Sequence, residues 1–85
     1  MAKIETDPPA WRKVHAEMSR RIRSGELKVG ERVPSLVALT AEFGIASATG
    51  MKVMRQLRED GLIRTEPGVG SKVADPEDWE PEEAP

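Results

Sequence analysis

The sequence predicts a small α+β domain in which three helices are followed by a β-hairpin. Three observations support this: apolar residues recur at helical spacing in three segments, a glycine follows each segment, and a strand–turn–strand pattern begins at residue 62. A chain of 85 residues has room for one small hydrophobic core. We divide it into an N-terminal arm over 1–7, a domain over 8–74 and an acidic, proline-rich tail over 75–85.

The first predicted helix begins after Asp7, a good N-cap residue, which is followed by two prolines that the first turn tolerates. It ends at Gly25, which suits the left-handed position after a helix. Its apolar face consists of four residues at spacings of three, four and four: Trp11, Val14, Met18 and Ile22. His15 lies at the edge of this face, so we predict no chemical task for it.

The second and third predicted helices are separated by a very short turn that contains Gly44. Ser35 follows a proline and is predicted to cap the second helix, over 36–43. Ser47 is predicted to cap the third helix, which runs over about 47–60. Two helices joined by so short a turn are typical of a helix-turn-helix.

The predicted hairpin, or wing, covers residues 62–74 and turns at Pro67-Gly68, the two central positions of a type II turn. A connector over 26–34 precedes the second helix and is expected to end in a short strand around Arg32-Val33. Three helices and a hairpin in this order form a winged helix-turn-helix.

The tail contains three prolines and six acidic residues, with Trp79 as its only large apolar side chain. Such a segment buries too little surface to fold alone, so we predict that the tail is disordered. Trp79 is expected to be unstructured, the alternatives being that it packs back on the domain or anchors a protein partner.

Charge is divided along the chain into two blocks of opposite sign, although the net charge is only −2. Residues 11–73 hold 12 basic against 7 acidic side chains, a balance of +5, whereas residues 74–85 hold six acidic side chains and no basic one. A basic body with an acidic tail is typical of proteins that meet a polyanion; a solvated surface is the alternative.

Composition excludes most enzyme classes and metal sites. The chain has no cysteine and a single histidine, which excludes disulfides, thiolate metal sites and a histidine-paired catalytic triad within one chain. It has no Walker-type phosphate loop. We therefore predict that the chain is not an enzyme and holds no cofactor or metal. The N-terminal residues include no apolar run, so we expect a cytoplasmic, nucleoid-associated protein without a membrane contact.

The third predicted helix carries side chains that lie away from its core face and are candidates for contact with DNA. Ala48 and Thr49 suit thymine methyl groups, Lys52 suits a guanine edge or a phosphate, and Arg55 suits a phosphate. Gln56 completes the set, and a merely solvated helix face is the alternative.

Three further positions leave alternatives or double roles. Gly50 allows a close approach either of DNA or of the second helix, because it has no side chain. We predict Met51 in the core or at its edge, with a contact in the DNA groove as the alternative. A helix N-terminus points N–H groups outward, so Ser35 also suits a phosphate.

Five blocks spaced along the chain together form a specific pattern. They are 22–27 (IRSGEL), 33–35 (VPS), 42–45 (EFGI), 57–63 (LREDGLI) and 67–71 (PGVGS). In order and spacing they resemble the DNA-binding domain of the gluconate-repressor (GntR) family, over about residues 11–74.

The resemblance implies a bacterial transcription regulator that binds operator half-sites as a homodimer, with the third helix in the major groove and the wing at the adjacent minor groove. Four charged contacts that the family usually has are absent from this sequence. The family usually has arginine at three positions that are here occupied by Val37, Ser47 and Met51, and it often has a basic residue at the position of Val69. The candidate DNA-contact set is Ser35, Ser47, Ala48, Thr49, Lys52, Arg55, Gln56, Gly68, Gly70, Ser71 and Lys72.

A second function remains open at this point. A winged helix without these arginines also suits a protein-interaction module that regulates another DNA-binding protein without reading bases itself. The acidic tail offers a contact for such a partner. No effector-binding domain follows the wing in this sequence, so we expect no small-molecule effector.

Overall fold

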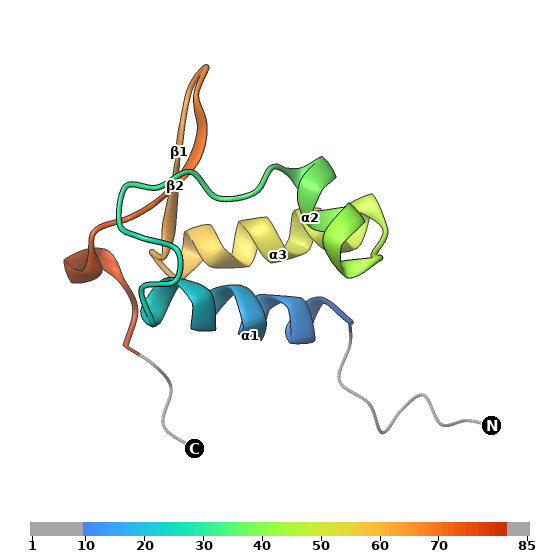
Figure 1. Ribbon diagram of the computed structural model, residues 1–85, viewed down its shortest axis with the longest axis horizontal. Coiled ribbons are helices and arrows are strands. Elements are labelled where there is room, and N and C mark those ends of the chain that lie inside the picture. The colour runs from blue at the N-terminus through green and yellow to red at the C-terminus, as the bar shows by residue number, and fades with distance from the viewer. Residues whose placement is uncertain (1–9, 82–85) are drawn as a thin grey trace.

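The computed structural model describes residues 10–81 and contains the three helices and the hairpin that the sequence predicts (Figure 1). Helices α1 and α3 run side by side, α2 lies across one end, and the hairpin projects away from α1. Asp7 and the rest of the predicted arm lie outside the described residues. The helices are α1 (Ala10–Arg23), α2 (Leu36–Phe43) and α3 (Ser47–Glu59), and the strands are β1 (Ile63–Glu66) and β2 (Gly70–Val73).

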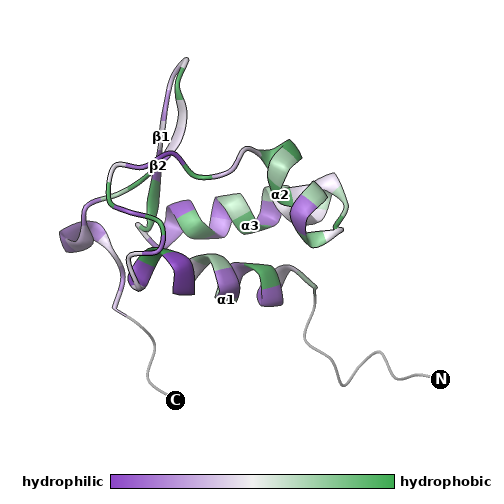
Figure 2. Cartoon of the chain, in the orientation of Figure 1, coloured by the Kyte–Doolittle hydropathy of each residue, from purple (hydrophilic) through white to green (hydrophobic). Residues whose placement is uncertain are grey.

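The core lies between α1, α2, α3 and the base of the hairpin. Apolar and polar bands follow one another along α1 and α3, because apolar residues recur every three or four positions in an amphipathic helix (Figure 2). Trp11 is half-buried and packs against this core. The rest of the predicted α1 stripe is buried together with residues of the other elements: Val14, Met18, Ile22, Val33, Leu39, Val53, Leu57, Leu62, Ile63 and Val73.

The chain turns by 115° between α2 and α3, which is the geometry of a helix-turn-helix. Ser35 caps α2 as predicted, because its hydroxyl accepts the N–H of Ala38 at 3.2 Å. The predicted cap of α3 was wrong. Ala46 occupies the cap position, since its carbonyl accepts the N–H of Gly50 at 3.0 Å, and α3 therefore begins with Ser47 already in its first turn.

The wing is paired along both edges of β2. On one edge β2 pairs antiparallel with β1, from Ile63 opposite Val73 to Glu66 opposite Gly70. On the other edge Arg32 forms a single bridge with Lys72, so the short strand predicted in the connector is one bridge long. The wing therefore has a fixed base.

The tip of the wing has the predicted turn. The Val69 N–H donates to the Glu66 carbonyl at 3.0 Å, and Gly68 has a φ of +75°. A positive φ at the third position is what a type II turn requires, and glycine adopts it without strain.

The first residues of the tail differ from the predicted disorder. Pro76–Asp78 form a short 3-10 helix, and Trp79 packs against the core while its indole N–H donates to the Ala74 carbonyl at 2.9 Å. The Glu80 N–H donates to the Asp60 carbonyl at 2.7 Å. Backbone hydrogen bonds and one buried aromatic face thus hold residues 75–81, and residues 82–85 lie outside the described residues.

The tail passes very close to the end of α3. A Cβ built on Gly61 would lie 2.0 Å from the carbonyl oxygen of Asp78, and Gly61 has a φ of +75°. Only glycine fits this position, because it lacks the atom that would collide and tolerates the left-handed backbone.

Candidate nucleic-acid interface

The first turns of α3 expose most of the residues that the sequence assigns to DNA contact. Ser47, Ala48, Lys52 and Arg55 are exposed, and Thr49 is half-buried. Neither Lys52 nor Arg55 forms an ion pair with another residue in the range 10–81. This part of the helix therefore offers positive charge and small side chains to solvent.

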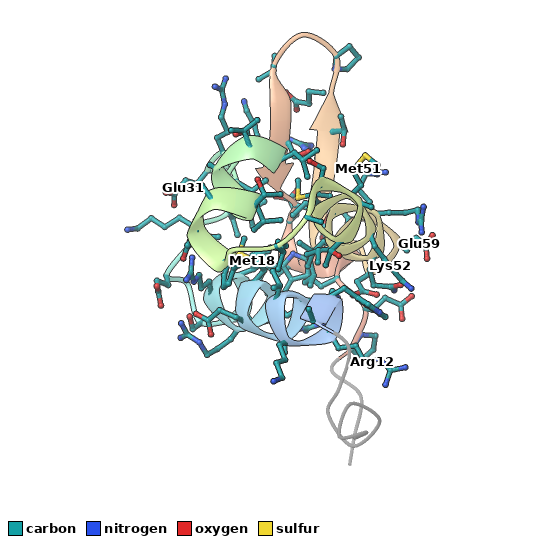
Figure 3. All side chains as sticks on the ribbon, turned by 90° about the vertical axis from the view of Figure 1, so that its right-hand side faces the viewer. Arg12, Met18, Glu31, Met51, Lys52 and Glu59 are labelled. Atoms are coloured by element: carbon teal, nitrogen blue, oxygen red, sulfur yellow. The ribbon has the colours of Figure 1, made fainter. Side chains whose placement is uncertain are left out.

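Lys52 lies at the edge between α3 and α1 rather than at the outermost part of α3. Its Nζ is 4.7 Å from the centre of the Trp11 ring, and the Arg12 guanidinium carbon is 5.6 Å from the same ring. Cations are attracted to the face of an indole at such distances. Figure 3 shows Lys52 and Arg12 on the same side of the molecule, so the two charges extend the positive surface of α3 towards α1.

Gln56 differs from the prediction, since it is half-buried and turned towards α1. Its amide donates to Asp60 Oδ1 at 3.0 Å, and Asp60 Oδ2 lies 2.6 Å from His15 Nε2. His15 therefore has a structural partner that its position at the edge of the stripe did not indicate. The i, i+4 spacing of Gln56 and Asp60 is the one sequence signal for this cluster.

The two alternatives left open at Gly50 and Met51 have clear outcomes. Gly50 is buried, and a Cβ built on it would lie 2.7 Å from Leu36 Cδ1, so the close approach is that of α2. Met51 is 55% exposed, and its predicted place in the core was wrong. Because α3 turns its Gly50 side towards α2, the next residue points about 100° away from that contact.

Met51 therefore lies on the exposed surface of the motif. Figure 3 shows its side chain on the hairpin side of α3, away from Lys52.

The wing offers backbone at its tip and side chains along its strands. Gly68 and Gly70 are exposed and have nothing within 4 Å of a Cβ position, so a ligand can approach their backbone closely. Ser71 and Lys72 are half-buried. Lys72 lies 3.7 Å from Glu66, which also pairs with Arg64 at 3.2 Å, so one carboxylate offsets part of the wing's positive charge.

Two arginines of α1 are held by carboxylates. Glu17 pairs with Arg20 at 2.7 Å and with Arg21 at 2.8 Å, and Arg21 reaches Glu42 of α2 at 2.6 Å. Hydrogen bonds from Arg20 and Arg21 lower the pKa of Glu17 from 4.5 to about 2. The positive charge of these arginines is therefore largely neutralised within α1 and α2, unlike that of Lys52 and Arg55.

The described part of the chain offers no alternative metal site. No group of three or more histidine, cysteine, aspartate or glutamate side chains in residues 10–81 is arranged to hold a metal ion. Within the same residues no single helix is long and apolar enough to cross a membrane, and the bent pair of α2 and α3 meets that test on length and composition alone.

These features define a winged helix-turn-helix domain with an exposed, basic third helix. The family model described as bacterial regulatory proteins, gntR family, matches residues 11–73. The chain belongs to this family, which confirms the resemblance over about residues 11–74. It is a family of regulatory proteins and not of enzymes.

Named relatives agree with this assignment. The histidine utilization repressor of Klebsiella aerogenes is 37% identical over 68 residues, which cover 80% of this chain and 28% of the repressor. The chain therefore spans less than a third of the length of this relative.

Two solved structures of the AraR DNA-binding domain also resemble the chain. One is in complex with operator ORR3, with a TM-score of 0.75, 28% identity and 80% of this chain and 82% of that one covered. The other is in complex with operator ORX1, with a TM-score of 0.77, 27% identity and 87% of this chain and 90% of that one covered.

Proposed function

We propose that this domain binds duplex DNA as part of a bacterial transcription regulator acting in the cytoplasm, at the nucleoid. In this proposal α3 enters the major groove and the wing lies at the adjacent minor groove. The observation that carries it is the exposed face of α3, on which Lys52 and Arg55 have no carboxylate partner in residues 10–81. The likeness to AraR domains in complex with operators supports it.

The candidate residues of α2 and α3 have roles in this proposal that follow from their positions, apart from Ser47 and Gln56, to which it assigns none. Lys52 and Arg55 neutralise phosphates on either side of the groove, because both are exposed and neither is paired with a carboxylate in residues 10–81. Ala48 and Thr49 approach base edges from the first turn of α3. The N-terminus of α2, capped by Ser35, accepts a phosphate, since its free N–H groups point outward.

The wing contacts the DNA backbone in this proposal. Gly68 and Gly70 allow the turn to approach the sugar–phosphate chain closely, because nothing lies near their missing side chains. Ser71 and Lys72 supply a hydroxyl and a charge from the strand that follows.

The domain binds DNA as a homodimer in this proposal. Two-fold docking of a helix-turn-helix places the recognition helices in successive major grooves, about 34 Å apart. Footprinting is therefore expected to show an inverted repeat. A single unrepeated half-site occupied by one chain would contradict the dimer but not the DNA contact.

A second candidate function is a protein-interaction module that regulates another DNA-binding protein. The observation that favours it is Val37, which is 76% exposed on α2 where the GntR pattern has arginine. In that case the isolated domain would show no salt-dependent affinity for duplex DNA.

The deciding experiment measures duplex DNA binding by fluorescence anisotropy across a salt series. Lys52→Ala and Arg55→Ala are each expected to weaken binding to all sequences and to lower the salt slope by about one. Lys13→Ala is the matched control, because Lys13 is an exposed cation on α1. Thr49→Ala is expected to change sequence preference instead. If Lys13→Ala has the same effect as the two α3 variants, the effect is general electrostatics and the assignment to α3 is wrong.

A further inference from the structure

Most exposed large apolar residues of this domain lie on the elements of the DNA-binding motif. In residues 10–81 there are four, and three of them belong to α2, α3 and the wing: Val37, Met51 and Val69, with Val29 in the connector as the fourth. Met51 leaves more than half of its surface in water. Exposure of this kind costs free energy in the isolated domain, so a bound state that covers Met51 is favoured.

Met51 is part of a row along α3. Ala48 precedes it by three residues and Arg55 follows it by four, so the three lie on neighbouring turns of one helix face. All three side chains are exposed. The row is therefore apolar at its N-terminal end and positively charged at its C-terminal end, and Met51 in its middle lies on the hairpin side of α3 (Figure 3).

The chemistry of this row fits one feature of the major groove. The C5-methyl group of thymine is the apolar group that a base presents there, and apolar side chains recognise it by contact. A thioether side chain has no charge to attract a guanine edge, but it is long and flexible enough to cover a methyl group.

We propose that Met51 is a specificity-determining residue that reads a thymine methyl group, with Ala48 beside it. This rests on the proposed function and names what α3 recognises: a half-site with thymine at the position that Met51 faces. Arg55, one turn further along, neutralises the neighbouring phosphate.

Charge and area favour DNA over a protein partner as the occupant of this surface. Met51 lies next to Arg55 on the exposed face of α3, and neither Arg55 nor Lys52 is paired within the described residues. A stable protein interface covers roughly 800 Å² on each partner. The four exposed apolar side chains instead lie on four separate elements, as scattered surface residues do.

The test uses duplexes selected by the protein from a random library, in which thymines of the half-site are then replaced one at a time by deoxyuridine. Deoxyuridine keeps the base pair and removes only the methyl group. The wild-type chain is expected to bind one such duplex about fourfold more weakly, which corresponds to ~0.8 kcal/mol for one buried methyl group. Met51→Ala is expected to bind the thymine and deoxyuridine duplexes with nearly equal affinity.

Two further variants sharpen the experiment. Val29→Ala removes an exposed valine from the connector and should keep the fourfold ratio of the wild type. Met51→Arg is expected to select guanine in place of thymine, because arginine reads the guanine edge. Circular dichroism checks that each variant is folded.

The outcomes separate this inference from the proposed function. If the wild-type chain binds thymine and deoxyuridine duplexes equally at every position, Met51 does not read a methyl group, while DNA binding itself stands. If the chain binds no duplex in a salt-dependent way, both the proposed function and this inference are overturned.

Discussion

Position 50 shows how one missing side chain sets the distance between two helices. Glycine inside a helix destabilises it by about 1 kcal/mol relative to alanine. At Gly50 the helix α2 occupies the space that the missing side chain leaves. A Cβ there would lie 2.7 Å from Leu36 Cδ1 and 3.0 Å from Thr40 Cγ2. The sequence indicated a close approach at this residue but not its direction, because only tertiary packing decides which surface comes near.

Gly50→Ala is therefore expected to destabilise the domain in spite of the better helix propensity of alanine. Overpacking typically costs about 1–3 kcal/mol against a propensity gain of about 1 kcal/mol, and the branched side chain of Thr40, 3.0 Å from the new Cβ, has little freedom to move aside. Urea unfolding measures the difference. In a background with Leu36→Ala the penalty should become smaller, since the nearest atom has been removed. An equal penalty in both backgrounds would show that Leu36 does not cause it.

The burial and partners of a side chain are hardest to predict from sequence where the neighbouring atoms belong to another helix or strand. Met51 was expected in the core because methionine often fills core gaps, yet α2 packs against the neighbouring Gly50. Gln56 was expected at the surface, yet it bonds to an aspartate that also reaches α1. In contrast Ser35 was predicted correctly as a cap, because capping depends on the next three residues alone.

Among the elements, α1 carries an ion-pair cluster of Glu17 with Arg20 and Arg21 that responds to pH. The pKa of Glu17 is lowered from 4.5 to about 2 by hydrogen bonds from Arg20 and Arg21. A lowered pKa in the folded state means that the ionised carboxylate stabilises the fold above pH 4.5, and that this contribution is lost as the pH falls towards 2.

Glu17→Gln is accordingly expected to lower the melting temperature at pH 7 and to change it little at pH 2. The effect is modest, because the pairs are exposed to solvent and screened by salt. Thermal unfolding followed by circular dichroism at both pH values makes the comparison. The account of α1 fails if the variant and the wild type differ by the same amount at pH 7 and pH 2.

Most elements could be predicted because their signals are local. The helices, their glycine ends and the wing turn each depend on a few neighbouring residues. The tail could not be predicted in this way. Its order depends on Arg23, which donates to the Glu80 carbonyl at 2.7 Å across a sequence separation of 57 residues, and on the face of the core that Trp79 covers.

For the whole molecule, the acidic tail should weaken the affinity of the basic domain for DNA, because its negative charges repel the phosphates. Asp75, Glu77 and Asp78 are exposed, so their replacement by amides leaves the packing of Trp79 intact and raises the net charge of −2 by three. Charges act over about 30 Å at 0.01 M salt, a distance that covers most of the 44 Å length of the domain. At 0.15 M salt they act over only about 8 Å, so the charge of the tail is then largely screened from the DNA.

The triple amide variant is therefore expected to bind duplex DNA more tightly than the wild type at 0.01 M salt and equally well at 0.15 M. Fluorescence anisotropy at the two salt concentrations measures both affinities. Equal affinities at low salt would show that the tail does not oppose DNA binding. Its acidic groups would then be better assigned to a contact with a protein partner.

The central claim is that α3 and the wing form the DNA-binding face, and amide chemical-shift mapping during titration with duplex DNA tests it most directly. We expect the largest shifts in residues 47–55 of α3, at the start of α2 and in the wing turn over 67–71, with little change in α1 near Arg20 and in the ordered tail over 75–81. The claim would be contradicted if the largest shifts lay in α1 and the tail while the amides of α3 and the wing stayed unchanged.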